Sequence, residues 1–435
     1  MDVSTKNMLL GRGELGHPEL WPHKAEAEAH KYYFTVDFGL RELPLEPGLI
    51  TVRGPRQYGK STWLETELYK SVQTYGAGST FYLNGDELVD ADALTRVLEE
   101  THTLFSPHAK VKRLFIDEIT AVAHWEKSVK RVIDRGLFRD VLMVSTGSKA
   151  LDLRRGTERL PGRKGKLRRS EFIFLPISYR EFKTRTQNIL GEKSWVAYLL
   201  SGGSPLACND ICQVGCIPDY LVQMIRDWIF GDVVASGRSR MNLTHVLQQL
   251  FAHGGNPLGY AKLAREAGLA NNTVASGYIE QLSDLLCVLP AWAWDANKCT
   301  HVMRKPCKFQ FINLAAVVAT HPAQLRSISD FEQLPTATQG LLLEWLVAQE
   351  LWRRSVLAGT DNPEAIGFWQ SEQHEIDFVT AENEWVEVKL GSSGPMEFMW
   401  FPKVFPKKNL TVVCSTPFEM QQVRGISIDE FLMAF

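Results

Sequence analysis

The segment Gly54-Pro-Arg-Gln-Tyr-Gly-Lys-Ser61 constrains the fold of this chain more than any other, and it directly follows the apolar run at residues 49–52. It fits the pattern G-x-x-x-x-G-K-[ST], a loop that joins a strand to a helix around phosphate groups. The glycines let backbone N–H groups surround phosphate oxygens, and the next helix points the positive end of its dipole at them. The pattern predicts a parallel α/β domain that binds a nucleoside triphosphate.

A second apolar strand, at residues 111–118, ends in the two carboxylates of Asp117 and Glu118. In a phosphate-loop domain such acids lie beside the nucleotide. We expect Asp117 to orient Mg²⁺ and Glu118 to polarise the attacking water. Lys60 is expected to reach the β- and γ-phosphates, and the Ser61 hydroxyl to hold Mg²⁺. These residues predict Mg²⁺-dependent ATP hydrolysis, with Lys60 and Glu118 as catalytic residues.

The third strand, at residues 141–148, ends in the hydroxyl side chains of Ser145, Thr146 and Ser148, at the sheet edge where ligands of open α/β folds bind. Ordinary turn chemistry also explains serine and glycine at this point. The residues expected to bind the nucleotide or its Mg²⁺ are Gly54, Pro55, Arg56, Gln57, Tyr58, Gly59, Lys60, Ser61, Thr62, Asp117, Thr146 and Ser148.

Residues 159–169 carry six basic side chains in eleven positions. One interpretation is an arginine finger, with Arg163 as the favoured catalytic candidate. Another is contact with a nucleic-acid backbone, and a third is a solvated basic loop. A strand-like stretch at residues 171–182 is expected to close the domain.

The motifs GPRQYGKST, LFIDEI, VSTGSKA, RLPGR and LPISYREF occur in this order and resemble AAA-type ATPases widespread in bacteria and archaea. Residues 198–205 and 228–232 are similar to segments of the family's helical lid. The resemblance implies a winged helix and a C-terminal restriction-endonuclease-like domain after the lid. It also implies that Thr146 or Ser148 senses the γ-phosphate.

The resulting fold class is α/β: an AAA-type P-loop sheet, a helical lid, a winged helix and a C-terminal PD-(D/E)xK-like domain. The expected divisions are an N-terminal extension (1–44), the ATPase core (45–182), the lid (183–240), the winged helix (241–295), a connector (296–334) and the nuclease-like domain (335–435).

The middle region, residues 243–286, has the pattern of three helices separated by turns. Asn271 or Asn272 is a candidate cap for the third helix, which would be the recognition helix of a helix-turn-helix. That helix presents Thr273, Ser276 and Tyr278 but no lysine or arginine. DNA binding by this element and a purely structural role therefore both stay open.

The C-terminal region combines an acid, a hairpin and an E-x-K sequence, as PD-(D/E)xK nucleases do. Glu387 and Lys389 are two apart on a strand and so share a face. In such nucleases carboxylates corresponding to Asp377 and Glu387 hold Mg²⁺, and a lysine corresponding to Lys389 stabilises developing charge or the attacking water. Alternating charged and apolar residues also occur on ordinary hairpins.

A helix predicted at residues 340–351 bears Glu344, which matches a third metal-binding acid of the nuclease family by resemblance. Because this helix is amphipathic, a surface position is the alternative. The sequence departs from the family at Asn313, where relatives usually have an acid. That difference leaves the E-x-K set intact.

Composition restricts the class of protein. Hydrophobic residues make up 45% and charged residues 23% of the chain, as in globular proteins. The net charge of −2 confines nucleic-acid binding to local basic surfaces. No apolar run reaches the roughly 18 residues of a membrane helix, and no secretory signal is recognisable, which predicts a cytoplasmic protein without a membrane partner. Cys208, Cys212 and Cys216 lack a fourth zinc ligand and are expected to be small packed side chains.

The leading hypothesis is an ATPase that acts on DNA, with ATP and Mg²⁺ as cofactors, and controls a metal-dependent nuclease-like domain. The alternative is a nucleotide-dependent switch or adaptor whose nuclease-like domain binds DNA or a protein without cutting. A third hypothesis is a homo-oligomeric ring closed by Arg163.

Overall fold

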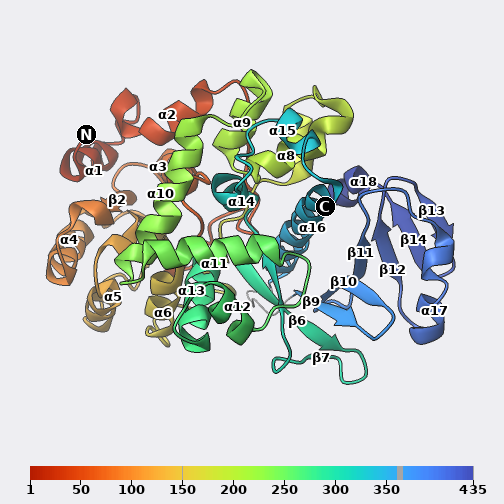
Figure 1. Cartoon of the computed structure of the whole chain (residues 1–435). Coiled ribbons are helices and arrows are strands. Elements are labelled where there is room, and N and C mark those ends of the chain that lie inside the picture. Colours follow the sequence, from red (N-terminus) through yellow and green to blue (C-terminus); the bar gives the residue numbers. More distant parts are fainter. Residues whose placement is uncertain (149, 360–365, 435) are drawn as a thin grey trace. The chain divides into compact units, whose positions relative to one another are not determined.

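The computed structural model describes residues 1–148, 150–359 and 366–434. These form two compact units (Figure 1). The first comprises residues 1–33 and 37–175, and the second comprises residues 34–36 and 176–435. The predicted N-terminal extension thus divides between the units, and most of it belongs with the phosphate-loop sheet.

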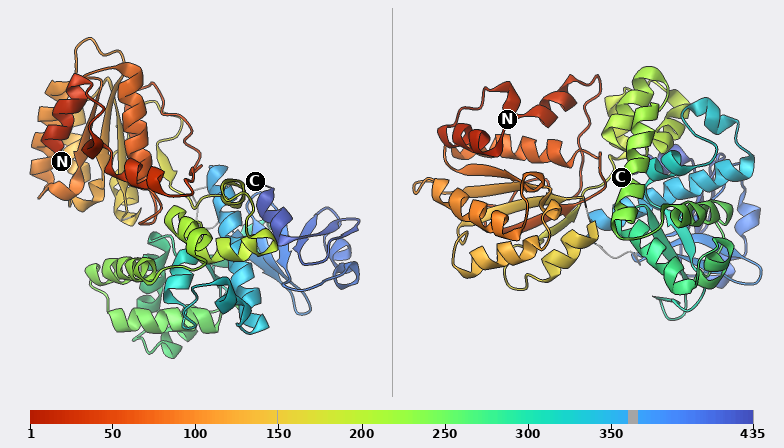
Figure 2. Two further views of the ribbon diagram at one scale, coloured as in Figure 1. Left: turned by 90° about the horizontal axis from the view of Figure 1, so that it is seen from above. Right: turned by 60° about the vertical axis from the view of Figure 1, so that its left-hand side comes forward.

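The first unit is built on a five-stranded parallel sheet in the order β2-β3-β4-β1-β5. Its strands are β1 (Gly48–Arg53), β2 (Thr80–Asn84), β3 (Lys112–Asp117), β4 (Val141–Gly147) and β5 (Glu171–Ile173). The parallel α/β fold class and the strands expected before the phosphate loop, before the acid pair and before the hydroxyl cluster are confirmed. The right-hand view of Figure 2 shows this sheet between two layers of helices.

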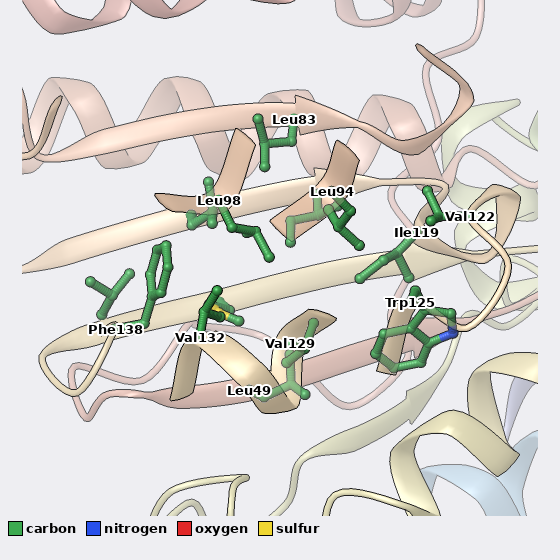
Figure 3. Packing of buried hydrophobic residues seen from close by; sticks show 14 of the residues in the cluster. Leu49, Leu83, Leu94, Leu98, Ile119, Val122, Trp125, Val129, Val132 and Phe138 are labelled. Carbon is green, nitrogen blue, oxygen red and sulfur yellow. The ribbon is translucent and has the colours of Figure 1, made fainter. Parts of the chain in front are cut away.

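The helices of this unit are α1 (Val3–Arg12), α2 (Pro22–Ala29), α3 (Lys60–Tyr75), α4 (Ala91–Leu104), α5 (Trp125–Asp134) and α6 (Ala150–Glu158), with 3-10 turns η1 (Pro18–Leu20), η2 (Gly85–Glu87) and η3 (Ile119–Ala121). Figure 3 shows apolar side chains of the strands meeting those of α4 and α5. Leu83, Leu98 and Val129 in this cluster are at most 1% exposed. This core fixes the strand ends that carry the nucleotide motifs.

The N-terminal helix α1 is attached to the edge strand β2 through one side-chain amide. Asn7 donates to the backbone carbonyl of Tyr82 and accepts from its N–H, both at 2.8 Å. Next to it, Lys6 is buried and forms an ion pair with Glu65 of α3 at 3.5 Å. An exposed edge strand is a template for unwanted pairing, and α1 counters this by packing along β2 and satisfying both backbone groups of Tyr82.

The second unit contains a long helical segment before its sheet. Its helices are α7 (Tyr179–Arg185), α8 (Ser194–Ser201), α9 (Pro205–Val214), α10 (Asp219–Ala235), α11 (Arg240–Ala252), α12 (Tyr260–Glu266), α13 (Asn272–Asp284), α14 (Leu314–Thr320), α15 (Ile328–Glu332), α16 (Thr336–Leu357), α17 (Phe401–Val404) and α18 (Ile428–Met433), with 3-10 turns η4 (Gly191–Lys193) and η6 (Pro395–Phe398).

Capping residues explain several boundaries. The strand expected at residues 171–182 stops after Ile173, because Ser178 accepts the backbone N–H of Glu181 and starts α7. The three predicted helices of the middle region are present as α11, α12 and α13, and Asn271 caps α13 by accepting from Val274. Asn313 caps α14 in the same way, accepting from Ala316. The departure from the family at position 313 therefore has a local structural role.

The cysteines behave as ordinary side chains. Cys208 and Cys212 lie on α9, which ends at Gly215 with φ 79°, so Cys216 lies beyond the helix. Cys208 is fully buried, and Cys212 and Cys216 are partly buried. The predicted structural role agrees with this arrangement.

One mixed sheet runs through the second unit in the order β13-β14-β12-β11-β10-β9-β6-β7, with β8 pairing β6. Its strands are β6 (Val288–Asp295), β7 (Thr300–His301), β8 (Lys308–Phe311), β9 (Ile366–Gln370), β10 (Glu375–Thr380), β11 (Trp385–Val388), β12 (Leu410–Val413), β13 (Phe418–Met420) and β14 (Val423–Ile426). The β9–β10 and β10–β11 pairs are antiparallel, whereas β11–β12 and β12–β14 are parallel.

The predicted winged-helix and nuclease-like regions share this sheet, because β6 pairs with β9 in parallel. Strand β8, which lies in the predicted connector, pairs antiparallel with β6. The connector therefore contributes side chains directly beside β9 and β10. No sequence boundary indicated this continuity.

Candidate functional sites

The phosphate loop joins β1 to α3 as predicted. Gly59 has φ 93°, a left-handed conformation that favours glycine, and it directly precedes α3. The Lys60 ammonium is buried and donates to the carbonyl oxygens of Gly54 and Pro55 at 2.8 and 2.7 Å. Burial lowers the pKa of Lys60 to about 8, against the opposing effect of Glu118 and Asp117. The loop lysine and the acid pair therefore lie close enough to interact.

The remaining loop residues differ in exposure. Arg56 and Gln57 are exposed, whereas the Tyr58 side chain is buried at 2% exposure. Ser61 and Thr62 lie half-buried in the first turn of α3, where backbone N–H groups have no partner within the helix. This turn is the expected phosphate position, with the Ser61 hydroxyl available for Mg²⁺.

The acid pair stands at the end of β3, beside the end of β4. Thr146 donates to Asp117 Oδ1 at 2.5 Å and accepts the backbone N–H of Glu118 at 3.1 Å. Glu118 has φ 46°, an unusual conformation for a residue with a side chain. This local geometry turns Glu118 out of the strand, and Asp117 stays in line with the sheet edge.

Three hydrogen bonds hold one oxygen of Glu118. Its Oε1 accepts from the Thr120 hydroxyl at 2.8 Å, from the Ser148 hydroxyl at 2.7 Å and from the Ser148 backbone N–H at 3.0 Å. Burial alone would raise the pKa of Glu118, but the Ser148 bonds together with Lys60 outweigh it and lower the pKa. Glu118 is thus held as a carboxylate in a fixed orientation.

Arg163 lies in the basic segment but is already engaged. Its guanidinium donates to both carboxylate oxygens of Asp134, from Nε at 2.7 Å and from the terminal nitrogen at 3.0 Å. This bidentate pair lies within the first unit and is partly exposed. The arginine-finger role of Arg163 stays a prediction, and it would require this pair to open.

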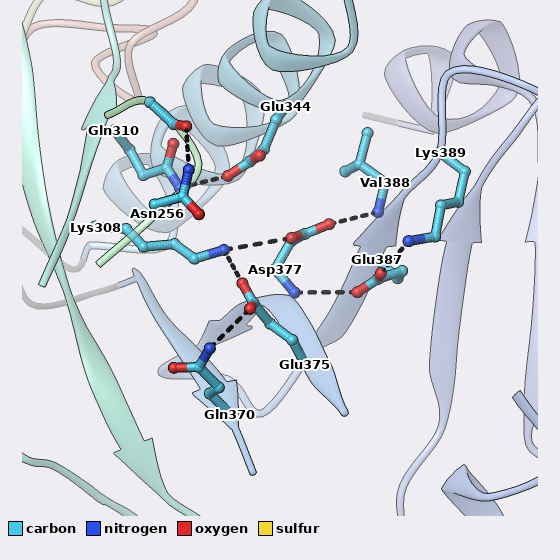
Figure 4. Close-up of polar contacts among 11 residues, drawn as sticks. Asn256, Lys308, Gln310, Glu344, Gln370, Glu375, Asp377, Glu387, Val388 and Lys389 are labelled. Carbon is cyan, nitrogen blue, oxygen red and sulfur yellow. Dashed lines mark hydrogen bonds and ion pairs between the residues drawn. The ribbon is translucent and has the colours of Figure 1, made fainter. Parts of the chain in front are cut away.

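The C-terminal candidates meet on adjacent strands of the second unit (Figure 4). The backbone N–H of Asp377 on β10 donates to Glu387 Oε2 at 3.2 Å, and the N–H of Val388 donates to Asp377 Oδ2 at 2.9 Å. Lys389 forms an ion pair with Glu387 Oε1 at 2.8 Å. A register shift between Ile376 and Val379 brings Asp377 to this position.

Glu344 approaches from α16. Its Oε1 accepts from Gln310 Nε2 of β8 at 2.8 Å. Burial and the neighbouring Asp377 raise the pKa of Glu344 to about 7, and the same causes raise the pKa of Glu387 to about 8. Burial is the larger cause of both shifts, and Asp377 adds to it because two carboxylates this close disfavour each other's ionisation.

Within the described ranges, no three His, Cys, Asp or Glu side chains are grouped so as to hold a metal ion. The three predicted ligands Glu344, Asp377 and Glu387 are thus not assembled as a single cage, and Glu344 is bound to Gln310 instead. Asp377 and Glu387 alone suit Mg²⁺, which usually keeps several waters and binds one or two carboxylates. The metal role of Glu344 stays a prediction.

Sequence reasoning missed Lys308, whose side chain is 1% exposed. Its ammonium forms ion pairs with Glu375 and, at 3.5 Å, with Asp377 Oδ1. Burial acts to lower the pKa of Lys308, but Asp377, Glu344 and Glu375 outweigh it and raise the pKa. The sequence did contain a pattern that could have indicated it. Lys308 and Gln310 alternate with Phe309 and Phe311, which gives this short strand one polar buried face.

Comparison with known proteins agrees with the geometry of the first unit. Residues 46–183 match the family model described as an AAA domain. With the parallel sheet, the phosphate loop and the acid pair in place, this part of the chain is an AAA-type P-loop ATPase domain. No curated protein matches the chain.

Solved structures with partial likeness include a Walker-type ATPase of Pyrococcus abyssi, at 12% identity over 71% of this chain and 97% of that chain, with a TM-score of 0.43. The ORC2 protein of Aeropyrum pernix is similar at 10% identity over 77% and 95%, with a TM-score of 0.38. A RuvB variant of Thermotoga maritima is similar at 14% identity over 56% and 82%, with a TM-score of 0.30. At these values the likeness indicates no activity of this chain.

None of the described helices combines the length and apolarity needed to cross a bilayer.

Proposed function

We propose that this protein hydrolyses ATP in its first unit and acts on DNA through its second unit, which carries a metal-dependent nuclease-like domain. The ATPase half is supported by the orientation of Glu118, whose carboxylate is held at Oε1 beside Lys60. Mg²⁺ bound with ATP between Ser61 and Asp117 would neutralise phosphate charge. Glu118 would then orient water, and Lys60 would hold the phosphates.

The nuclease-like half rests on one observation, the direct bond from Asp377 N–H to Glu387 with Lys389 paired to the same carboxylate. The order of helix α16, the antiparallel strands β9, β10 and β11 and the parallel strand β12 supports a PD-(D/E)xK-like domain. A Mg²⁺ ion held by Asp377 and Glu387 would polarise a phosphodiester. Lys389 would stabilise the charge that develops.

The DNA-facing surface is proposed at the connections among β6, β7 and β8. Helices α11 to α13 followed by this antiparallel ladder support a winged helix. Lys298, Arg304 and Lys305 are exposed in these connections, whereas the first turn of α13 has no basic residue. Phosphate contacts from basic side chains supply most non-specific DNA affinity. We therefore assign contact with the DNA backbone to the connections among β6, β7 and β8, which form the wing of the proposed winged helix.

The test incubates plasmid and linear DNA with the full chain, Mg²⁺ or Mn²⁺, with and without ATP. Cleavage by the wild type and its loss in the Asp377→Ala, Glu387→Ala double variant support the proposal. Lys60→Ala should abolish ATP turnover without removing the carboxylate site. Cleavage that persists in the double variant contradicts the nuclease assignment.

The second candidate is a nucleotide-dependent switch whose nuclease-like domain binds without cutting. It is favoured by the ion pairs that already engage Asp377 and Glu387 with lysines. ATP-dependent shifts of DNA or protein affinity, with no cleavage under any metal condition, would support it. Arg163-dependent assembly is tested separately by the mass of the particle with and without ATP.

A further inference from the structure

The charged cluster of the second unit is built around a buried ammonium, that of Lys308. Its partners Glu375 and Asp377 both come from β10, and the Phe368 ring of β9 lies 5.4 Å from the nitrogen. Removing such a charge from water costs several kcal/mol unless well-placed partners compensate it. Glu375 in turn accepts a hydrogen bond from Gln370 Nε2 at 3.1 Å. Two carboxylates and an aromatic ring therefore surround the buried Lys308 ammonium.

Asp377 faces two cation positions at once. Its Oδ1 faces Lys308 at 3.5 Å, and its other side is tied to β11, where Glu387 lies. Figure 4 shows Asp377 between Lys308 on one side and Glu387 with Lys389 on the other. Two-metal sites for phosphoryl transfer hold their ions about 4 Å apart. In this chain the Lys308 ammonium lies on one side of Asp377, and the Glu387 carboxylate lies on the other.

The net charge of the ionised side chains in this cluster matches the binding of one divalent cation. With all groups ionised, the carboxylates of Glu344, Glu375, Asp377 and Glu387 face the ammoniums of Lys308 and Lys389. This leaves two negative charges, which one divalent ion neutralises. A neutral oxygen also belongs to this cluster: Gln310 Oε1, beside Glu344, is buried and has no hydrogen-bond partner among the residues that the structure describes. Carboxamide oxygens are ordinary ligands of hard cations.

We propose that Lys308 is a built-in cation of this cluster, so that the site takes one divalent ion fewer than its carboxylates would otherwise bind. The proposal deepens the proposed nuclease-like function and rests on it for the identity of the remaining ion. Lys308 is a positioning residue: it fixes Asp377 between β8 and β11 and leaves the Glu387 side for the metal. The cluster then binds one metal ion, because the Lys308 ammonium takes the place of a second.

The test counts bound Mn²⁺ by electron paramagnetic resonance on the full chain without nucleotide. The wild type should bind one Mn²⁺ that Asp377→Asn removes. Lys308→Gln should bind one more than the wild type, because a second ion replaces the ammonium. Equal counts for Lys308→Gln and the wild type overturn the proposal.

Two control variants show whether the Mn²⁺ count depends on the positive charge at position 308 or on the net charge of the protein. Lys305→Gln removes the same charge from an exposed residue three positions away and should leave the count unchanged. Lys308→Arg keeps the charge and should keep the wild-type count. A gain of Mn²⁺ in Lys305→Gln equal to that in Lys308→Gln would also contradict the assignment, because the effect would then be one of general charge.

The melting transition reports on folding, and the number of Mn²⁺ ions bound by the wild type reports on the proposed function. If Lys308→Gln loses its melting transition without metal, Mn²⁺ should restore it, and a variant that stays unfolded at every Mn²⁺ concentration overturns the proposal. The absolute wild-type count tests the nuclease-like function: no Asp377-dependent ion in the wild type contradicts that function. One ion in Lys308→Gln and none in the wild type would still support Lys308 as the built-in cation.

Discussion

The Ser148→Ala variant tests the catalytic orientation of Glu118 most directly. The Ser148 hydroxyl donates to Glu118 Oε1 at 2.7 Å, and its loss leaves the Ser148 backbone N–H and the Thr120 hydroxyl as donors to the same oxygen. A hydrogen bond to a charged group contributes about 1.5–3 kcal/mol. Because two donors remain, we expect the lower end, which is about a tenfold decrease in kcat.

Steady-state ATP hydrolysis measures this effect. Ser148→Ala should lower kcat and leave KM for ATP nearly unchanged, since the hydroxyl contacts the acid and not the phosphate loop. Ser145→Ala is the matched control, because Ser145 lies on β4, the strand that Ser148 directly follows, and its hydroxyl donates to the Ile50 carbonyl at 3.3 Å. It should retain wild-type kcat.

A double-mutant cycle with Glu118→Gln completes the design. Once the carboxylate is gone, Ser148→Ala should cause no further loss of residual turnover. An unchanged kcat in Ser148→Ala refutes the orienting role. An equal decrease in the Glu118→Gln background also refutes it, because Ser148 would then act on another step.

Three further outcomes are expected. Gly85→Ala should lose hydrolysis but keep ATP binding, because the new methyl carbon would lie 2.2 Å from the Glu118 carbonyl oxygen and displace that residue; wild-type turnover would contradict this. ATP affinity should fall about tenfold per pH unit above pH 8, because the buried Lys60 ammonium has a pKa of about 8 and only its charged form binds phosphate well; a flat titration curve up to pH 9.5 would contradict this. Asn7→Ala should lower the free energy of unfolding of the first unit by about 1–3 kcal/mol, because two bonds to Tyr82 are lost, and chemical denaturation with no shift in midpoint would refute it.

The chemistry of the first unit was largely predictable because its signals are local. Lys60 and Ser61 belong to one short loop, and Asp117 and Glu118 close one strand. Backbone conformation at such turns follows from residue type within a few positions. The bonds from Ser148 to Glu118 were not predictable, because they depend on how β4 lies beside β3.

The second unit shows the opposite balance. Sequence alone indicated Asp377, Glu387 and Lys389 through alternation on a hairpin, and the structure brings them together. The sequence alone gave no reason to connect Lys308 with Asp377, which lies 69 positions later in the chain.

The sequence by itself therefore determined the phosphate loop, the acid pair and the parallel sheet that presents them. Only the tertiary structure decided that Arg163 is paired with Asp134 and that Lys308 is paired with Asp377. The physical reason is range: loop and strand-end chemistry is encoded within a few residues, whereas the partner of a buried charge is set by strand pairing across the sheet. A buried lysine indicates that an acid is near, and only the fold shows which acid it is.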